Sequence, residues 1–316
     1  MAGVHVVFGA TGALGSAIVR ELIARGEFVR AVVRDPEEGK AILPETAGIV
    51  SGDALDPESA ASAVRGAEVV YDCVNVRYSK WTEMLPSIRS NVMAAARKAS
   101  ALLVYPDTVH AYGPLQRTPA TEEHPRAALS KKGMLRAEIE KNLLDADRRG
   151  DVRAVIPRYP DLYGPYVVNP TIRPMFEAAL NEKTATWPVS LEVPHDLVFV
   201  EDAARAAILL GSRDDAYGQV WHVPGPGPLT GRQFLETIFA EAGTKPRVRA
   251  VGKRLFRLFG YFIPEAGEMG ELLYQYENPL ILDGRKFAAA FPDFRFTPHA
   301  DAIRQSVEWY KEMLGD

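Results

Sequence analysis

Short runs of apolar, mostly β-branched residues alternate with longer helical patterns through the first half of the chain. The runs predict buried strands at residues 5–8, 29–33, 49–51, 69–74, 102–105 and 154–156. The first helix places Leu14, Ile18 and Leu22 on one face, and further helices are predicted at 59–64, 88–100 and 130–149. This alternation is typical of an α/β fold with a doubly wound parallel sheet, whose ligands bind beyond the carboxyl ends of the strands.

The second half of the chain has a different pattern. After about residue 165 the alternation weakens, and proline, glycine and aromatic residues become more frequent. We therefore expect a first domain over 1–165, completed by about 195–223, in which 220–223 return to the sheet. Residues 166–316 are expected to form mainly a second, smaller domain that covers the ligand edge of the sheet.

Composition and charge narrow the class of protein. Apolar residues make up 47% and charged residues 25% of the 316 residues, which is typical of a folded globular chain. The 37 Lys and Arg against 41 Asp and Glu give a net charge of −4, and neither sign forms a long block. This excludes an electrostatic footprint for nucleic acid or an anionic membrane, so we expect a small-molecule partner.

The N-terminal residues and the cysteine content indicate which cell compartment to expect. Residues 1–5 contain no Lys or Arg, and Gly9 and Gly12 break the first apolar run, so neither a secretory signal nor a membrane span fits. A single cysteine, Cys73, excludes an internal disulfide and any cysteine-rich metal site. We expect a cytoplasmic protein.

A glycine-rich turn, GATGALG, lies between the first predicted strand and the first helix. Glycines at these positions permit a tight turn and let backbone amides approach a pyrophosphate at the helix N-terminus. The alternative is a turn that only connects the strand to the helix. The turn predicts dinucleotide binding, with cofactor contacts from Gly9, Thr11, Gly12, Ala13, Leu14 and Gly15.

The end of the second strand bears on which dinucleotide is bound. Arg34 could hold the 2′-phosphate of NADP, while Asp35 is placed to start the turn before Pro36. The alternative is that Arg34 is an ordinary solvated side chain and Asp35 holds the ribose of NAD. We favour NADP over NAD. Further contacts are expected from Asp53 and Ala54 at the adenine and from Asn75 at the nicotinamide ribose.

Together with longer segments, the glycine turn carries a family resemblance. The segments are Gly52-Asp53, residues 108–114 (TVHAYGP), residues 158–165 (RYPDLYGP) and residues 198–204 (VFVEDAA). The chain resembles the short-chain dehydrogenase/reductase superfamily, in its extended and atypical NAD-dependent epimerase/dehydratase branch. The resemblance implies an NAD(P)-binding Rossmann-type domain followed by a substrate-binding domain. It also implies a homodimer built on the helices at 88–100 and 130–149.

In that family a Ser or Thr orients the substrate oxygen, a Tyr transfers the proton, and a Lys four residues after the Tyr holds the nicotinamide ribose. Thr108 matches the first role and Lys132 the last, with Lys131 as the second choice. Positions 127 and 128, where the Tyr would stand, are both Ala. The proton must then come from elsewhere, or hydride chemistry is absent.

Three residues could replace the missing tyrosine. The His110 imidazole titrates near neutrality, and Tyr112 and Tyr163 lie in motifs that reach the ligand edge. For each of them the alternative is a structural role, either a hydrogen-bonded loop histidine or an aromatic ring packed under its Gly-Pro turn.

Several further residues are candidates for substrate contact. Tyr78 and Trp81 follow the fourth strand, Asp161 stands where many relatives have Asn, and His195 precedes Asp196 where nucleotide-sugar relatives usually have Arg. A histidine followed by a carboxylate is a poor diphosphate ligand, which favours a smaller or more apolar substrate. The apolar stretch at 255–262 could line its pocket, belong to the core, or form a basic amphipathic partner surface.

Other chemistries find no support in the sequence. The six histidines are dispersed without an HExxH helix, and neither a GxSxG elbow nor a P-loop is present, so we expect no metal. The leading hypothesis is an NADP(H)-dependent oxidoreductase acting on the carbonyl or hydroxyl of a non-nucleotide small molecule. The alternatives are a non-catalytic dinucleotide-binding sensor or scaffold, and a redox-neutral epimerase or dehydratase that retains its cofactor.

Overall fold

The computed structural model describes residues 3–253 and 270–315, and these residues form two compact units. The first unit comprises the described residues of Met1–Ala111, Lys131–Tyr159 and Ala203–Trp221. The second comprises those of Tyr112–Ser130, Pro160–Asp202 and His222–Asp316. The predicted division near residue 165 stays a prediction.

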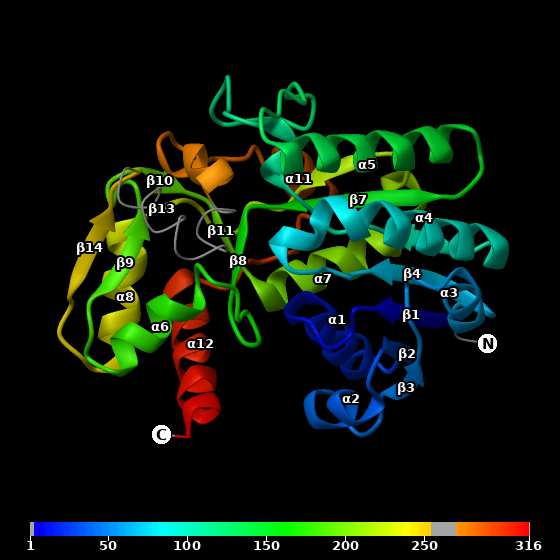
Figure 1. Ribbon diagram of the computed structural model, residues 1–316, viewed down its shortest axis with the longest axis horizontal. Coiled ribbons are helices and arrows are strands. Elements are labelled where there is room, and N and C mark those ends of the chain that lie inside the picture. Colours follow the sequence, from blue (N-terminus) through cyan, green and yellow to red (C-terminus); the bar gives the residue numbers. More distant parts are fainter. Residues whose placement is uncertain (1–2, 254–269, 316) are drawn as a thin grey trace. The chain divides into compact units, whose positions relative to one another are not determined.

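A largely parallel sheet forms the centre of the first unit (Figure 1). Among the described residues it has eight strands in the order β12-β7-β5-β4-β1-β2-β3, with β6 paired to β7. The strands are β1 (Val4–Phe8), β2 (Phe28–Val33), β3 (Gly48–Ser51), β4 (Ala67–Asp72), β5 (Leu102–Val104), β6 (Asp107–Thr108), β7 (Ala154–Tyr159) and β12 (Val220–His222). This confirms the predicted doubly wound sheet and the return of the chain to it at residue 220.

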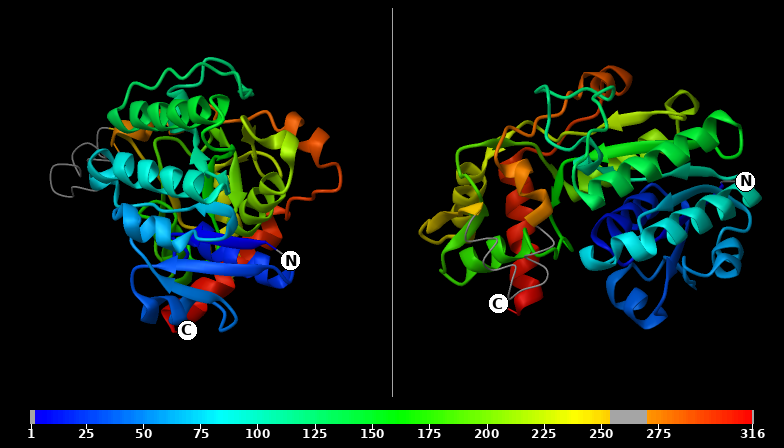
Figure 2. Two further views of the ribbon diagram at one scale, coloured as in Figure 1. Left: turned by 90° about the vertical axis from the view of Figure 1, so that its right-hand side faces the viewer. Right: turned by 45° about the horizontal axis from the view of Figure 1, so that its top comes forward.

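Helices cover both faces of this sheet. They are α1 (Ala13–Ala24), α2 (Pro36–Ile42), α3 (Pro57–Ala63), α4 (Trp81–Ala99), α5 (Lys131–Arg148) and α7 (Val200–Gly211). Helices α3, α4 and α5 lie on one face, with α4 beside α5 (Figure 2). Alternate strand residues such as Val6, Phe8 and Val70 are buried beneath these three helices, as the period of two in a strand requires.

The structure extends one predicted helix. Helix α4 begins at Trp81 rather than at residue 88, and it continues through Pro86. Proline removes one backbone donor in a helix interior, which makes a break at this point the expectation from sequence. The Trp81 side chain is only 1% exposed, so burial of the indole offsets the lost hydrogen bond and keeps the first turns helical.

The second unit is built from short strand pairs and helices. Strands β8 (Asp161–Tyr163) and β11 (Leu197–Phe199) pair in parallel, as do β9 (Ala185–Pro188) and β14 (Val248–Val251), while β10 (Pro194–His195) and β13 (Leu229–Thr230) are antiparallel. The helices are α6 (Arg173–Leu180), α8 (Gly231–Ala242), α11 (Arg285–Ala290) and α12 (His299–Leu314). Helix α8 packs on both α6 and α12.

Two further points concern the chain as a whole. In the described ranges, none of the helices has the length and apolar character that crossing a membrane requires. The apolar stretch at 255–262, considered above as a pocket wall or partner surface, lies outside the described residues.

Candidate active site

The glycine turn after β1 is packed so tightly that a side chain is excluded at its first and last positions. Gly9 has φ +68°, and a Cβ atom there would lie 2.7 Å from the carbonyl oxygen of Cys73. A Cβ atom at Gly15 would lie 2.2 Å from the carbonyl oxygen of Gly9. Real atoms do not approach this closely, so both positions require glycine for helix α1 to start directly above the strand.

The first turn of helix α1 presents its backbone donors to solvent. Gly12 is the exposed N-cap, and the structure records neither a side-chain cap nor an acidic residue in the first turn of this described helix. Thr11, Ala13 and Leu14 are half-buried around it. Uncapped N–H groups at a helix N-terminus bind anions, so this turn fits the pyrophosphate of a dinucleotide.

At the end of β2 the two candidate ribose contacts have different surroundings. The Asp35 carboxylate caps helix α2 and accepts a hydrogen bond from the backbone N–H of Glu37 at 2.9 Å. Arg34 is exposed, and within the described residues no hydrogen bond or ion pair is recorded for its guanidinium group. The carboxylate is thus engaged locally, while the guanidinium group is available.

The adenine candidates lie after β3. The exposed Asp53 carboxylate accepts a hydrogen bond from Leu55 N at 2.9 Å, and Ala54 is buried. The Ala54 carbonyl oxygen accepts from the side-chain amide of Asn91 on α4 at 3.0 Å. Helix α4 therefore fixes the loop that carries both candidates.

A buried ion pair anchors the loop after β4. Arg89 on helix α4 donates to the Asp72 carboxylate and to the carbonyl oxygen of Val74, and both charged side chains are less than 10% exposed. Asn75, the predicted nicotinamide contact, follows directly and is exposed. The ion pair fixes the start of the loop, which then leads into η1 (Tyr78–Lys80).

Three predicted site residues form one hydrogen-bonded chain at the carboxyl edge of the sheet. The Thr108 hydroxyl, at the end of β6, is hydrogen-bonded to Nδ1 of His110 in the following η2 turn (Val109–Tyr112). Nε2 of the same imidazole lies 3.3 Å from the Tyr78 hydroxyl. The His110 imidazole thus links Thr108, which is predicted to orient the substrate oxygen, to Tyr78, which is predicted only to contact the substrate.

The surroundings of His110 keep its imidazole neutral. Its side chain is 4% exposed. Burial first, and then the cationic side chains of Arg136, Lys132 and Arg158, lower its pKa from the ordinary 6.5 to about 3. At neutral pH, one ring nitrogen therefore carries a proton and the other accepts a hydrogen bond.

Helix α5 delivers three charged side chains along one buried face. Lys132, Arg136 and Glu140 are spaced by four residues, which places them on the same side of a helix. The Lys132 ammonium lies 5.6 Å from the centre of the Tyr78 ring, and the side chain is only 3% exposed. Lys131 is exposed instead. The structure thus brings Lys132, rather than Lys131, to the Thr108–His110 pair.

Trp81 holds Tyr78 in place. The two rings stack with 4.4 Å between centres and an interplanar angle of 18°. The indole N–H donates to the Val76 carbonyl oxygen at 2.9 Å, and the Arg136 guanidinium lies 4.2 Å from the indole ring centre. Aromatic stacking and the cation–π contact together fix the orientation of the phenol.

A buried charge network beneath the site was missed by sequence reasoning. Arg158 on β7 donates to Asp107 at 2.7 Å and to Glu140 at 2.8 Å, and Arg136 lies 3.5 Å from Asp107. Each of the four side chains is less than 5% exposed. An arginine inside the apolar strand VIPRY was the available signal. The network fixes β6, and with it the residue that follows Asp107, which is Thr108.

The two tyrosine candidates lie in the second unit and are both completely buried. The Tyr112 hydroxyl lies 2.6 Å from Nε2 of His222. The Tyr163 hydroxyl lies 2.8 Å from Nδ1 of His299, whose Nε2 is 2.7 Å from the Gly227 carbonyl oxygen. Since Nε2 must donate to that carbonyl in the neutral ring, Nδ1 accepts a hydrogen bond from the Tyr163 hydroxyl.

Two predicted substrate contacts are also engaged within the second unit. The Asp161 carboxylate accepts a hydrogen bond from the Tyr276 hydroxyl at 2.9 Å, and burial raises its pKa. The two ring nitrogens of His195 lie 3.0 Å from the Val193 and 2.6 Å from the Gln275 carbonyl oxygens. Asp196 is buried and accepts from Leu282 N at 2.7 Å.

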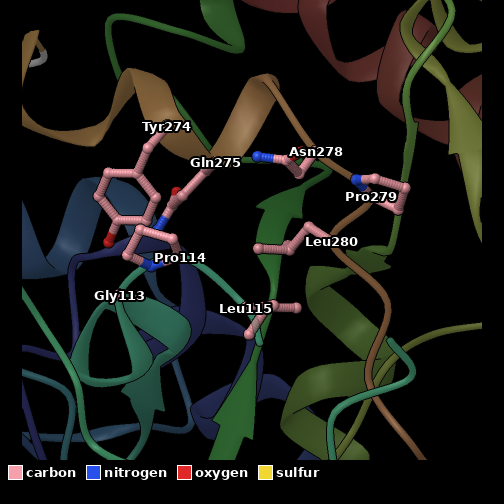
Figure 3. Close-up of a pocket in the computed structure, with 8 residues that line it drawn as sticks. All are labelled: Gly113, Pro114, Leu115, Tyr274, Gln275, Asn278, Pro279 and Leu280. Atoms are coloured by element: carbon pink, nitrogen blue, oxygen red, sulfur yellow. The ribbon is translucent and has the colours of Figure 1, made fainter. Parts of the chain in front are cut away.

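A small pocket in the second unit contains two unusual polar groups (Figure 3). The Tyr274 and Gln275 side chains extend from η4 (Gly270–Tyr276) toward Pro114. The Tyr274 hydroxyl and the Gln275 Nε2 are both buried, and neither has a hydrogen-bond partner of good geometry among the described residues.

Comparison with known proteins agrees with this arrangement. Residues 5–223 match the model of the NAD dependent epimerase/dehydratase family. A 3-diazoavenalumate denitrifying reductase from a Streptomyces species is 29% identical in an alignment 287 residues long, which covers 82% of this chain and 88% of that protein. A ketoreductase from Stigmatella aurantiaca, which acts on a farnesylated dihydroquinoline oxide, is 24% identical in an alignment 253 residues long, which covers 77% of this chain and 74% of the relative.

Solved structures show the same fold. The dTDP-glucose 4,6-dehydratase of Bacillus anthracis, solved in complex with NAD, superposes with a TM-score of 0.82 over 98% of this chain and 97% of its own, at 17% identity. At this identity the likeness concerns the fold alone. Because the family model covers most of the chain, this protein belongs to the NAD dependent epimerase/dehydratase family and is an enzyme of the NAD(P)-dependent oxidoreductase type.

Proposed function

We propose that the protein is an NADP(H)-dependent reductase that acts on the carbonyl group of a non-nucleotide small molecule. The observation that carries this proposal is the Thr108–His110 hydrogen bond at the carboxyl edge of the sheet, with buried Lys132 beside it. A hydroxyl backed by an imidazole can both orient a carbonyl oxygen and move a proton to it. The names of the two curated relatives, a reductase and a ketoreductase, support the same reaction class.

The preference for NADP rests on the end of β2. Asp35 is engaged as the cap of α2, so a ribose hydroxyl would have to compete with the Glu37 N–H for this carboxylate. The exposed Arg34 can approach a 2′-phosphate with several donors at once. A non-nucleotide substrate is supported by His195, whose two ring nitrogens both face backbone carbonyls rather than a ligand phosphate.

In this proposal each part of the chain has one task. The backbone amides that follow Gly12 bind the pyrophosphate, and Lys132 binds the nicotinamide ribose. The bound dinucleotide supplies the hydride. Thr108 holds the substrate oxygen, and the Thr108–His110 pair passes a proton to it while the buried imidazole stays neutral.

The first test is a fluorescence titration of the purified protein with NADPH and with NADH. We expect NADPH to bind more tightly, and Arg34→Ala to weaken NADPH at least about tenfold while changing NADH less than about twofold. The reason is that each charge-assisted hydrogen bond contributes about 1.5–3 kcal/mol, and 1.4 kcal/mol is a factor of ten. Tighter binding of NADH, or binding of neither, would overturn the assignment.

A matched control is Arg25→Ala. Arg25 is also exposed, and it pairs with Glu21 within helix α1, away from the end of β2. We expect this variant to bind both nucleotides as the wild type does.

Oxidation of NADPH is then followed at 340 nm with a panel of aliphatic, aromatic and quinone carbonyls. Tight binding without turnover on any member would favour the sensor alternative over a reductase.

A further inference from the structure

The replacement for the missing family tyrosine is visible in the geometry of the first unit. We propose that Tyr78 is the proton source of the site, and that it acts through His110 and Thr108 as one directed relay to the substrate oxygen. This inference rests on the proposed reductase function. The inference adds a named proton donor, the Tyr78 phenol. Tyr78 lies in the loop after β4, whereas Lys132 lies on helix α5.

The three groups form an unbroken path. The Tyr78 hydroxyl is 3.3 Å from His110 Nε2, and His110 Nδ1 is hydrogen-bonded to the Thr108 hydroxyl. His110 itself is almost fully buried, whereas Tyr78 and Thr108 at the two ends are only half-buried. Each end can therefore reach a small molecule, and the imidazole between them is sealed from water.

The electrostatics of the site give the relay its mechanism. The pKa of about 3 prevents the imidazole from storing a proton as an imidazolium ion at neutral pH. It can still pass one on, because a neutral ring that loses its Nδ1 proton while gaining one at Nε2 changes tautomer and not charge. His110 thus conducts the proton, and another group must supply it.

Neighbouring side chains fix the position of Tyr78. The Lys132 ammonium lies 5.6 Å from the centre of the Tyr78 ring, and the Trp81 indole stacks on that ring. The Arg136 guanidinium in turn lies 4.2 Å from the centre of the Trp81 ring. These contacts hold the Tyr78 hydroxyl 3.3 Å from His110 Nε2, where it can donate its proton to the imidazole.

The proton balance of the step is complete. As the carbonyl carbon gains the hydride, the Thr108 O–H bond breaks and the substrate O–H bond forms. Thr108 takes the Nδ1 proton of His110, and Nε2 of His110 takes the Tyr78 proton. After the product leaves, water donates a proton to the half-buried Thr108 hydroxyl, which passes its own proton to His110 Nδ1. Nε2 then returns its proton to the Tyr78 phenolate, and this reverse transfer restores all three groups.

The first test reads the direction of the hydrogen bonds without cofactor or substrate. In histidine-labelled protein, long-range ¹H–¹⁵N correlation spectra distinguish the Nδ1–H from the Nε2–H tautomer, and the His110→Gln spectrum assigns the signal. We expect the Nδ1–H tautomer in the wild type, because Nε2 accepts from Tyr78. In Tyr78→Phe we expect a shift toward the Nε2–H tautomer. An Nε2–H tautomer in the wild type would overturn the relay.

The second test measures turnover of whichever carbonyl of the panel is reduced fastest. General acids contribute about 10²–10⁴-fold to rate, so Tyr78→Phe is expected to lower kcat about 100-fold or more. KM and the NADPH dissociation constant should change less than twofold, since the ring, its stacking and the Lys132 contact remain. An unchanged kcat in this variant would refute a catalytic role for the phenol.

Tyr217→Phe is the matched control. Tyr217 also has a cation over its ring, Arg153 at 4.7 Å, but its hydroxyl donates to the Gly211 carbonyl oxygen. We expect wild-type kcat from this variant. Failure of the wild type to bind NADPH removes the proposed function itself. The tautomer measurement then decides by itself whether the Tyr78–His110–Thr108 path has the proposed direction.

Discussion

Replacing His110 with glutamine is expected to make the folded protein more resistant to acid. The folded-state pKa of this imidazole, about 3, lies below the ordinary 6.5 of an unfolded chain, because burial and three cations disfavour the charged form. As the pH falls below 6.5, the unfolded chain binds a proton at this position and the folded chain does not. Stability is therefore lost as the pH falls from 6.5 toward 3, and glutamine, which does not titrate, removes this contribution.

The size of the effect follows from the two pKa values. Each pH unit between the two pKa values corresponds to about 1.4 kcal/mol of lost stability. Acidification from pH 7 to pH 5 therefore lowers the free energy of unfolding of the wild type by about 2 kcal/mol through His110 alone. Any folded-state pKa below about 4 gives nearly the same figure at pH 5. We therefore expect the free energy of unfolding of His110→Gln to fall by about 2 kcal/mol less than that of the wild type over this range.

Urea unfolding at pH 5, 6 and 7 measures the difference, provided that fluorescence and circular dichroism give coincident transitions. Thr108→Val is the control, since it keeps the imidazole and should retain the pH dependence of the wild type. Equal pH dependence in His110→Gln and wild type would refute the reasoning. A directly measured His110 pKa above about 6 would do the same.

Four further predictions concern single substitutions. Gly15→Ala should lower stability by about 1–3 kcal/mol in thermal unfolding. Gly12→Ala, whose Cβ would lie 3.3 Å from the Gly9 oxygen, should weaken NADPH binding in a fluorescence titration with a smaller loss of stability. Arg158→Met removes the cation that the buried Asp107 and Glu140 carboxylates share and should cost about 3–5 kcal/mol in urea unfolding, so wild-type stability would contradict the network. Gln275→Met removes a buried donor without a good partner and should raise stability by about 1 kcal/mol, whereas a loss of that size would show that the amide is satisfied.

The order of strands and helices in the first unit could be predicted because each element carries its own signal. The β-branched runs identified β1, β2, β3, β4, β5 and β7 to within a few residues, since strands buried on both faces must be apolar. The start of α4 could not be placed, because Pro86 contradicts a helix locally and only tertiary burial of Trp81 restores it.

The candidate site also contains parts that could and parts that could not be predicted. The glycine turn follows from the spacing of residues within one short segment, and the resemblance to the family points to Thr108 and Lys132. The contact of Tyr78 with His110 joins positions 32 residues apart, and that of Arg158 with Asp107 joins positions 51 apart. No local periodicity encodes such pairs, because they depend on which strands become neighbours in the sheet. For this reason the sequence pointed to His110, Tyr112 and Tyr163 as proton donors and to Tyr78 only as a substrate contact, while the fold brings the Tyr78 hydroxyl to His110.

The helix cap at Asp35 constrains how cofactor preference could change during evolution. A mutation that released this carboxylate to a ribose hydroxyl would leave helix α2 uncapped, at a cost of about 1 kcal/mol. Position 34 carries no such burden, because its side chain is exposed and caps nothing. In descendants of this chain, a switch of dinucleotide is therefore expected to appear as an acidic residue at position 34, while position 35 keeps a helix-capping side chain.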